Sequence, residues 1–140
     1  MVQAQEVAVH DSVAEKHFKK GKKAISTGIF KWSADYIEGS FEFEKAAKRF
    51  ALSGLDAKAM DAWLAYSDCC KQNNEMSAAA EGLQEAAFCS QDIDQSMQLL
   101  QAADENYKAG GYADRGLTLI KRFAKQLIDK GTDVAKTKAM

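Results

Sequence analysis

The stretch of sequence that decides the fold is YIEGSFEFEKAAKRFALSGLD, residues 36–56. Its small and aromatic residues recur in steps of four and three, the spacing of one face of an α-helix: Tyr36, Ser40, Phe43, Ala47, Phe50 and Gly54. Ser53-Gly54 interrupts the pattern, and Leu55-Asp56 begins a new one. The stretch therefore predicts two consecutive helices joined by a short turn.

A similar arrangement recurs along the chain. A Phe lies near the end of three predicted helices, at Phe50-Ala51, Phe88-Cys89 and Phe123-Ala124. An Asp is the second residue of the pair that opens the next helix, at 55–56, 93–94 and 132–133. We expect this Asp to accept hydrogen bonds from free N–H groups of the first turn. Helix pairs that recur every 35–39 residues indicate a helical-repeat solenoid.

Composition favours the same architecture. The 140 residues contain no proline, 46% are hydrophobic and 28% are charged, and good helix formers dominate. The pattern predicts helices over about 12–26, 35–53, 55–72, 75–90, 93–109 and 112–130, with a seventh starting at 132 after Gly131. We therefore predict one all-α domain over residues 1–140, a tetratricopeptide-like right-handed solenoid of antiparallel helix pairs with six to seven helices, in which residues 1–10 are frayed.

The cysteines and the hydropathy pattern favour a cytoplasmic protein. Cys69, Cys70 and Cys89 give neither the spacing of a zinc knuckle nor an even number for disulfides, so we expect buried, reduced thiols. No apolar run approaches the roughly 18 residues that a membrane span needs, and the N-terminus lacks the apolar core of a signal peptide. We expect a protein that contacts membranes only from outside, with no metal and no cofactor.

One predicted link is unusually apolar. Between the first two predicted helices the chain reads GIFKW, residues 28–32, and places Ile29, Phe30 and Trp32 where a polar link is expected. Residues 16–31 also hold six lysines and no acid, a charge of +6 in a chain whose net charge is −1. A local basic cluster suits an anionic membrane or an acidic partner better than nucleic acid, whose binders are basic more broadly.

This combination predicts a membrane-contact site with the following residues: Ile29, Phe30, Trp32, Lys19, Lys20, Lys22, Lys23 and Lys31. The lysines would attract anionic lipids and the apolar side chains would insert, giving a weak and salt-sensitive attachment. Two alternatives remain open. The apolar side chains can instead fold back on the helices, with Trp32 as a wedge between the first two, and the lysines can form a solvated helix face.

A second basic set lies on the last predicted helices: Lys108, Arg115, Lys121, Arg122 and Lys125. These residues would line the concave face of a solenoid and bind an acidic helix bundle, or they form a solvated face. Nothing predicts catalysis, because neither His10 nor His17 has an identifiable partner and Gly110-Gly111 lacks the Lys of a phosphate loop. We therefore expect a protein that is not an enzyme.

Several segments resemble the soluble NSF attachment proteins, particularly the gamma type. The resemblance is carried by AEKHF at 14–18, GIFKW with DY at 28–36, FEKAAKRF at 43–50 and ADENYKAGGY at 103–112. It covers about residues 12–130, and GIFKW followed by DY is its most specific part.

The resemblance implies an adaptor in intracellular membrane fusion and vesicle transport. Members of this family form twisted sheets of antiparallel helix pairs, bind the four-helix SNARE complex and recruit the ATPase NSF, which dismantles that complex. An apolar loop between their first two helices touches the membrane, and Ile29, Phe30 and Trp32 match its position. Because family members are about twice as long and engage NSF through their C-terminal part, we expect this chain to be an N-terminal portion that does not stimulate NSF alone. The alternative is a generic tetratricopeptide-like scaffold that binds a peptide in its concave groove.

Overall fold

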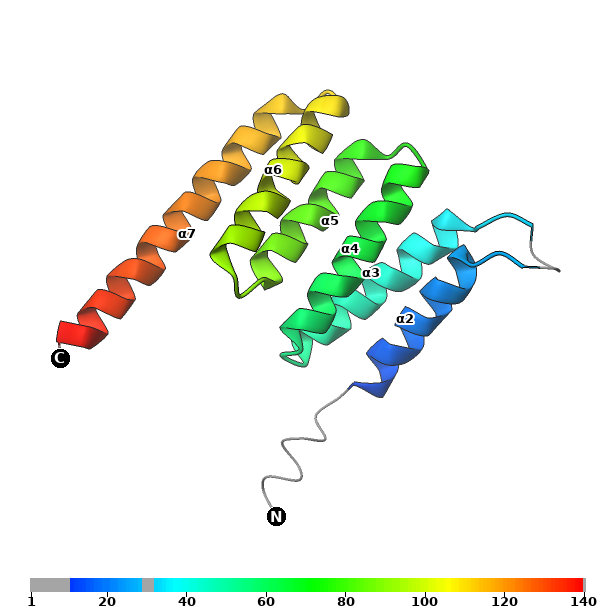
Figure 1. Ribbon diagram of the computed structural model, residues 1–140, viewed down its shortest axis with the longest axis horizontal. Coiled ribbons are helices and arrows are strands. Elements are labelled where there is room, and N and C mark those ends of the chain that lie inside the picture. The colour runs from blue at the N-terminus through cyan, green and yellow to red at the C-terminus, as the bar shows by residue number, and fades with distance from the viewer. Residues whose placement is uncertain (1–10, 29–31, 140) are drawn as a thin grey trace, which may run out of the picture.

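A computed structural model describes residues 11–28 and 32–139, with side chains described up to Asp129 except that of Leu127. This part of the chain forms six α-helices: α2 (Ser12–Ile25), α3 (Tyr36–Leu52), α4 (Asp56–Gln72), α5 (Met76–Cys89), α6 (Ile93–Ala109) and α7 (Ala113–Ala139). Consecutive helices run antiparallel and pack side by side in one row, with α2 at one end and α7 at the other (Figure 1). The predicted all-α, tetratricopeptide-like helical-repeat fold is confirmed. The predicted fraying of residues 1–10 lies outside the described residues.

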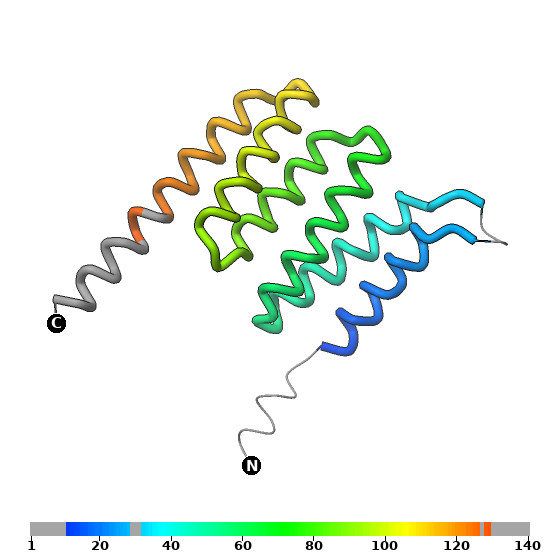
Figure 2. The backbone as a smooth tube through the Cα atoms, in the orientation of Figure 1, coloured from blue at the N-terminus to red at the C-terminus, as the bar shows by residue number. Residues whose placement is uncertain are grey.

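Three of the turns that reverse the chain are built in the same way. A residue with positive φ follows α3, α4 and α6, at Gly54 (φ 74°), Asn74 (φ 61°) and Gly111 (φ 85°). After each of these the next backbone N–H donates to the carbonyl five residues before it, as from Leu55 to Phe50 at 2.9 Å. This bond ends the helix and leaves room for a link of only three residues (Figure 2).

The expected break at Gly131 is wrong. The backbone stays helical from Ala113 to Ala139, so Thr132-Asp133 lies within α7 and starts no seventh helix. A single glycine among good helix formers costs only about 1 kcal/mol relative to alanine, which is too little to end a helix. The aspartates at the other two repeat starts lie in first turns, but Asp56 does not cap α4 through its side chain, and Asp92 rather than Asp94 caps α6.

Two core clusters hold the row of helices together. The first joins α2 to α5 and the second joins α5 to α7, and alanines fill most buried positions in the first. Phe43 and Phe50, on the helix face predicted from the sequence, are buried, and so is Leu100 of α6. In α2 the buried residues are Ala14, Gly21 and Ala24, whereas Val13 is 47% exposed.

Helices α2 and α3 approach each other closely through two glycines. A Cβ added to Gly21 would lie 2.7 Å from ring carbon Cε1 of Phe43, and one added to Gly39 would lie 2.6 Å from Cγ2 of Ile25. Both distances are shorter than van der Waals contact, so these positions have no room for a methyl group. The close contact fixes α2 against α3 and thereby positions the link between them.

Candidate functional site

The link between α2 and α3 is closed at its base by hydrogen bonds. The backbone N–H of Asp35 donates to the carbonyl of Ala24 at 2.8 Å, across the two ends of the link. The Asp35 carboxylate accepts from the N–H of Glu38 at 3.0 Å and so caps α3. On the α2 side, the hydroxyl of Ser26 donates to the carbonyl of Lys23 at 2.8 Å. The bond between Asp35 and Ala24 holds the two helix ends together.

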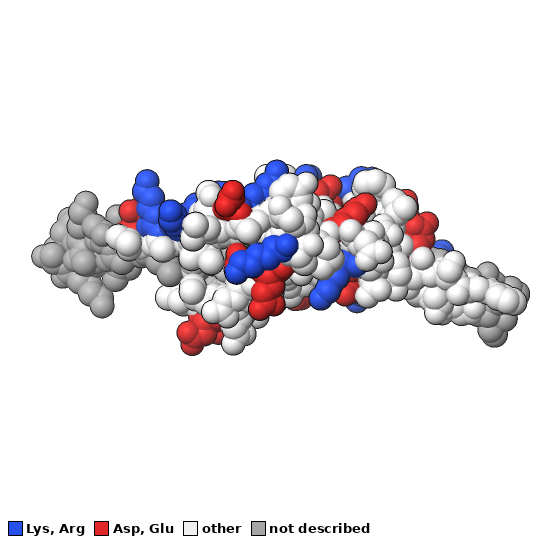
Figure 3. All heavy atoms as spheres, turned by 90° about the horizontal axis from the view of Figure 1, so that it is seen from above, with Lys and Arg blue, Asp and Glu red and all other residues white. Residues whose placement is uncertain are grey.

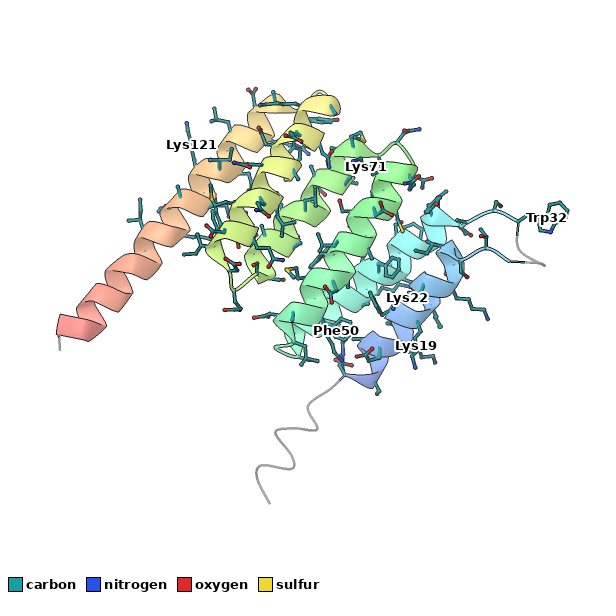
Figure 4. The ribbon with its side chains drawn as sticks, viewed as in Figure 1. Lys19, Lys22, Trp32, Phe50, Lys71 and Lys121 are labelled. Carbon is teal, nitrogen blue, oxygen red and sulfur yellow. The ribbon has the colours of Figure 1, made fainter. Side chains whose placement is uncertain are left out.

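The Trp32 side chain is 89% exposed and projects away from the helices (Figure 4). The alternative in which Trp32 acts as a wedge between the first two helices is therefore wrong. Ile29, Phe30 and Lys31 lie outside the described residues. The described part of the link thus presents one large aromatic side chain to its surroundings, an arrangement that side-chain burial alone does not favour.

Four lysines of α2 share one helix face, because their spacing of three, one and three residues follows the helical period. Lys16, Lys19, Lys20 and Lys23 line a surface hollow of about 670 Å³, to which α4 contributes Lys58. We call these five residues the lysine hollow. Lys16 was not in the predicted contact set, and Lys58 has no signal in the sequence, because only the packing of α4 beside α2 brings it there.

Lys22 differs from the rest of the predicted lysine set. Its amine lies 4.9 Å from the ring centroid of Phe18 instead of lining the lysine hollow. A cation at this distance from an aromatic ring is attracted to the ring face. Lys19, Lys20 and Lys23 are therefore brought together by the structure, whereas Lys22 lies apart from them.

Two buried carboxylates fix α2 in position. The Asp11 carboxylate caps α2 through the N–H groups of Val13 and Ala14 and accepts from Ser53 at 2.5 Å and from Arg49 at 2.6 Å. The hydrogen bond from Ser53 is the main reason that the pKa of Asp11 falls from 3.8 to about 2, with the Ala14 N–H and Arg49 adding to it against the effect of burial. The start of α2 is thereby tied to the end of α3.

The second buried carboxylate belongs to Glu42 of α3. Ring nitrogen Nδ1 of His17 donates to Oε2 of Glu42 at 2.6 Å. Burial raises the pKa of Glu42, but the hydrogen bond from His17 and the charges of Lys45 and Lys20 outweigh it, so the pKa lies below its ordinary value. His17 thus has a structural role between α2 and α3.

A groove of about 650 Å³ lies on another surface, lined by side chains from α3 to α7. Its aromatic residues are Trp63, Tyr66 and Tyr107, and the hydroxyl of Tyr107 donates to Oε1 of Gln84 at 3.0 Å. Its charged residues are of both signs: Glu44, Glu81, Glu85 and Asp114 against Lys48, Arg115 and Arg122. The groove is therefore polar and mixed in charge rather than basic.

The second predicted basic set is not gathered on this groove. Of its five members only Arg115 and Arg122 line it. Arg115 lies 3.6 Å from Glu81 and its guanidinium lies over the ring of Tyr112, while that of Arg122 lies over the ring of Phe88. Lys108 pairs with Asp104 at 2.9 Å, and the labelled Lys121 lies on α7 (Figure 4).

Charges of both signs are also interspersed elsewhere on the surface. Viewed from the edge that carries the α4–α5 and α6–α7 links, basic and acidic side chains alternate without a broad area of one sign (Figure 3). On that face the molecule offers no extended electrostatic surface for a partner. The lysine hollow differs from that face, because five lysines and a single acid, Glu15, line it.

The described residues contain no group of three His, Cys, Asp or Glu side chains that could hold a metal ion. Cys69 and Cys70 are buried and free, and Cys89 is partly buried and free. Burial raises the pKa of Cys69 to about 12 and that of Cys70 to about 11. Of the helices that the structure describes, none is long and apolar enough to span a bilayer.

Comparison with known proteins gives a distant relative. No protein-family model matches the chain. The chain is 25% identical over 118 residues to a gamma-soluble NSF attachment protein of Dictyostelium discoideum, a match that covers 82% of this chain. It spans 36% of the length of that relative. The resemblance predicted from the sequence is confirmed: over most of its length, this chain is distantly similar to a gamma-type soluble NSF attachment protein.

Proposed function

We propose that this chain is a non-enzymatic adaptor of intracellular membrane fusion, cytoplasmic and peripheral to the membrane. It would contact the membrane through the α2–α3 link and bind SNARE complexes through its helical row, in an assembly that recruits the ATPase NSF. The observation that carries the proposal is the exposed Trp32 on a link that adjoins a row of lysines. The similarity to a gamma-soluble NSF attachment protein supports it.

The membrane contact uses two forces that are weak alone. Burying a large apolar side chain in the interfacial region contributes about 1.5–3 kcal/mol, and each lysine near an anionic surface adds on the order of 1 kcal/mol. Among the described residues, Trp32 would supply the apolar contribution, and Ile29 and Phe30 would add to it. Lys19, Lys20, Lys22, Lys23 and Lys31 would supply the electrostatic contribution. Such an attachment is reversible and weakens as salt rises.

The test is co-sedimentation of the chain with phosphatidylserine-containing vesicles at low and high salt. Trp32→Ser should weaken binding about tenfold, at the low end of the value of a buried aromatic side chain. Ile29→Ser with Phe30→Ser should weaken it further. Leu52→Ser is the matched control, because Leu52 is 83% exposed at the end of α3 remote from the link. Equal binding of the wild-type chain and both link variants would eliminate the membrane contact.

SNARE binding is tested separately by pull-down with an assembled four-helix SNARE bundle. The candidate residues remain Lys108, Arg115, Lys121, Arg122 and Lys125. Reversing Arg115 and Arg122 probes the groove, and reversing Lys121 and Lys125 probes the rest of the set, with an equal change in charge. Loss of SNARE binding in only one of the two double variants would identify the binding face. Full SNARE binding by both double variants would exclude these residues.

A second function is favoured by the groove itself. A concavity of about 650 Å³ with three aromatic residues and charges of both signs suits an extended or helical peptide held by a tetratricopeptide-like scaffold. Lys48→Ala with Glu81→Ala, which truncates two exposed side chains of the groove, should then weaken peptide capture while leaving vesicle binding unchanged. The adaptor proposal predicts instead that the link variants impair vesicle binding, so the two functions give opposite patterns in the same pair of assays.

A further inference from the structure

The lysine hollow is an open, shallow depression lined by lysines of two helices. Four of its lysines come from α2 and the fifth, Lys58, comes from α4, so that amines approach the hollow of about 670 Å³ from two helices. The α2 lysines extend over about 10 Å, the rise of seven helical residues. A small ligand in the hollow would therefore meet several amines at once.

The charge of the hollow is strongly positive. Among the described lining residues, Glu15 is the only acid, and its carboxylate is paired with Lys58, so five lysines and one glutamate give these residues a net charge of +4. Among the described residues, Lys16, Lys19 and Lys20 form no ion pair. Like charges held this close repel one another, and a polyanion that binds between them removes the repulsion.

The number of lysines around the hollow favours clustered phosphates over a single anionic group. Each lysine amine is a compact cation with three hydrogen-bond donors, and lysine is a common ligand of phosphate. One monoester phosphate or carboxylate contacts one or two amines, whereas several phosphates on one sugar-sized ring can contact several lysine amines at once. The row also ends at Lys23, three residues before the link begins at Ser26. The Lys23 end of the hollow is thus the end nearest the link.

We propose that the lysine hollow binds a headgroup that carries several phosphates on one ring, as in a phosphoinositide bisphosphate of the membrane. This inference rests on the membrane contact proposed above and gives it a lipid preference. The same phosphate chemistry is present in a free inositol trisphosphate. The experiment therefore includes both sources.

The chain is titrated with phosphatidylcholine vesicles that contain phosphatidylinositol bisphosphate or, at equal surface charge, phosphatidylserine. We expect at least tenfold tighter binding to the first. Lys16→Gln with Lys20→Gln should weaken that binding about 30-fold, since each lysine near the membrane is worth about fivefold. Lys45→Gln with Lys71→Gln is the charge-matched control, because it removes two exposed lysines of α3 and α4 that do not line the hollow. The control should change the affinity less than threefold.

A second arm uses free inositol trisphosphate and isothermal titration calorimetry. Binding of both the vesicles and the free headgroup supports the membrane source, and binding of the free headgroup without a vesicle preference supports a soluble one. Equal binding to the two vesicle types with no binding of free trisphosphate would overturn the proposal. Trp32→Ser should leave trisphosphate binding intact, so a failure of the membrane contact is distinguishable from a failure of the headgroup site.

Discussion

The contact between Gly21 and Phe43 gives a prediction whose sign depends on the packing of α2 on α3. A methyl group added in Gly21→Ala would lie 2.7, 2.8 and 3.0 Å from Cε1, Cδ1 and Cζ of the Phe43 ring. That ring is only 1% exposed, and its neighbour Phe18 lies edge-on at 5.3 Å between centroids. The ring therefore has little space into which to move.

Two effects of opposite sign contribute to the outcome. Alanine is favoured over glycine inside a helix by about 1 kcal/mol. An extra carbon in a well-packed core costs about 1–3 kcal/mol. The net expectation for Gly21→Ala is a loss of about 1 kcal/mol in the free energy of unfolding, or about 4 °C in Tm for a chain of this size.

The assay is urea unfolding followed by circular dichroism, in a double-mutant cycle with Phe43→Leu. The smaller leucine removes the ring atoms that the methyl group would meet, so Gly21→Ala should be less destabilising in that background. We expect a coupling energy of about 1 kcal/mol or more between the two sites. Stabilisation by Gly21→Ala, together with additivity in the cycle, would refute the close contact of α2 with α3.

Three further predictions concern the core, the cap of α2 and the thiols. Phe50→Ala should lower the free energy of unfolding by about 3–5 kcal/mol, because Phe50 is 2% exposed in the first core cluster; a loss below about 1 kcal/mol in urea titrations would contradict this. The lowered pKa of Asp11 means that its carboxylate stabilises the fold above about pH 4, and that this contribution is lost as the pH falls through about 2. The Tm difference between the wild type and Asp11→Asn should therefore shrink over that range, and a constant difference would count against the cap. Cys69 and Cys70 should react with a thiol reagent at pH 8 more slowly than Cys89, because both are buried and their pKa values are about 12 and 11; mass spectrometry that finds Cys69 labelled first would argue otherwise.

The helix boundaries were predictable because their signals are local. The sequence predicts a helix from 55 to 72 and another from 93 to 109, and the structure has Asp56–Gln72 and Ile93–Ala109. Glycine or asparagine at the position that needs positive φ marks three of the helix ends, and that preference is visible in the sequence alone. The error at Gly131 has the same origin, because glycine permits a helix end without requiring one.

The role of Gly21 was not predictable in this way. From the sequence alone this residue only weakens a helix, whereas in the structure it permits the contact with Phe43. The partners of Asp11 were equally hidden, because Arg49 and Ser53 are 38 and 42 residues away along the chain. Such effects depend on which helix faces pack together. The spacing of residues in the sequence identifies the apolar face of a helix but not the helix that packs against it.

The candidate sites illustrate the same limit. Charge counting identifies the lysines of α2, since they are close in sequence, but Lys58 joins them only through packing. On α7, Arg115 and Arg122 are seven residues apart and share the groove face, whereas Lys121 and Lys125 do not line it. The rotation of α7 about its own axis decides between these positions, and it is set by contacts with α6 that periodicity does not specify.

The described helices are connected in series, since the substantial packing runs from each helix to the next along the chain. A row of this kind behaves mechanically as a spring. Small rotations at successive helix contacts add up along the row, so its two ends can be displaced relative to each other without breaking any single interface. A torque applied at α7 would reach the link beside Trp32 only through four intervening helices, and the whole row would share the strain.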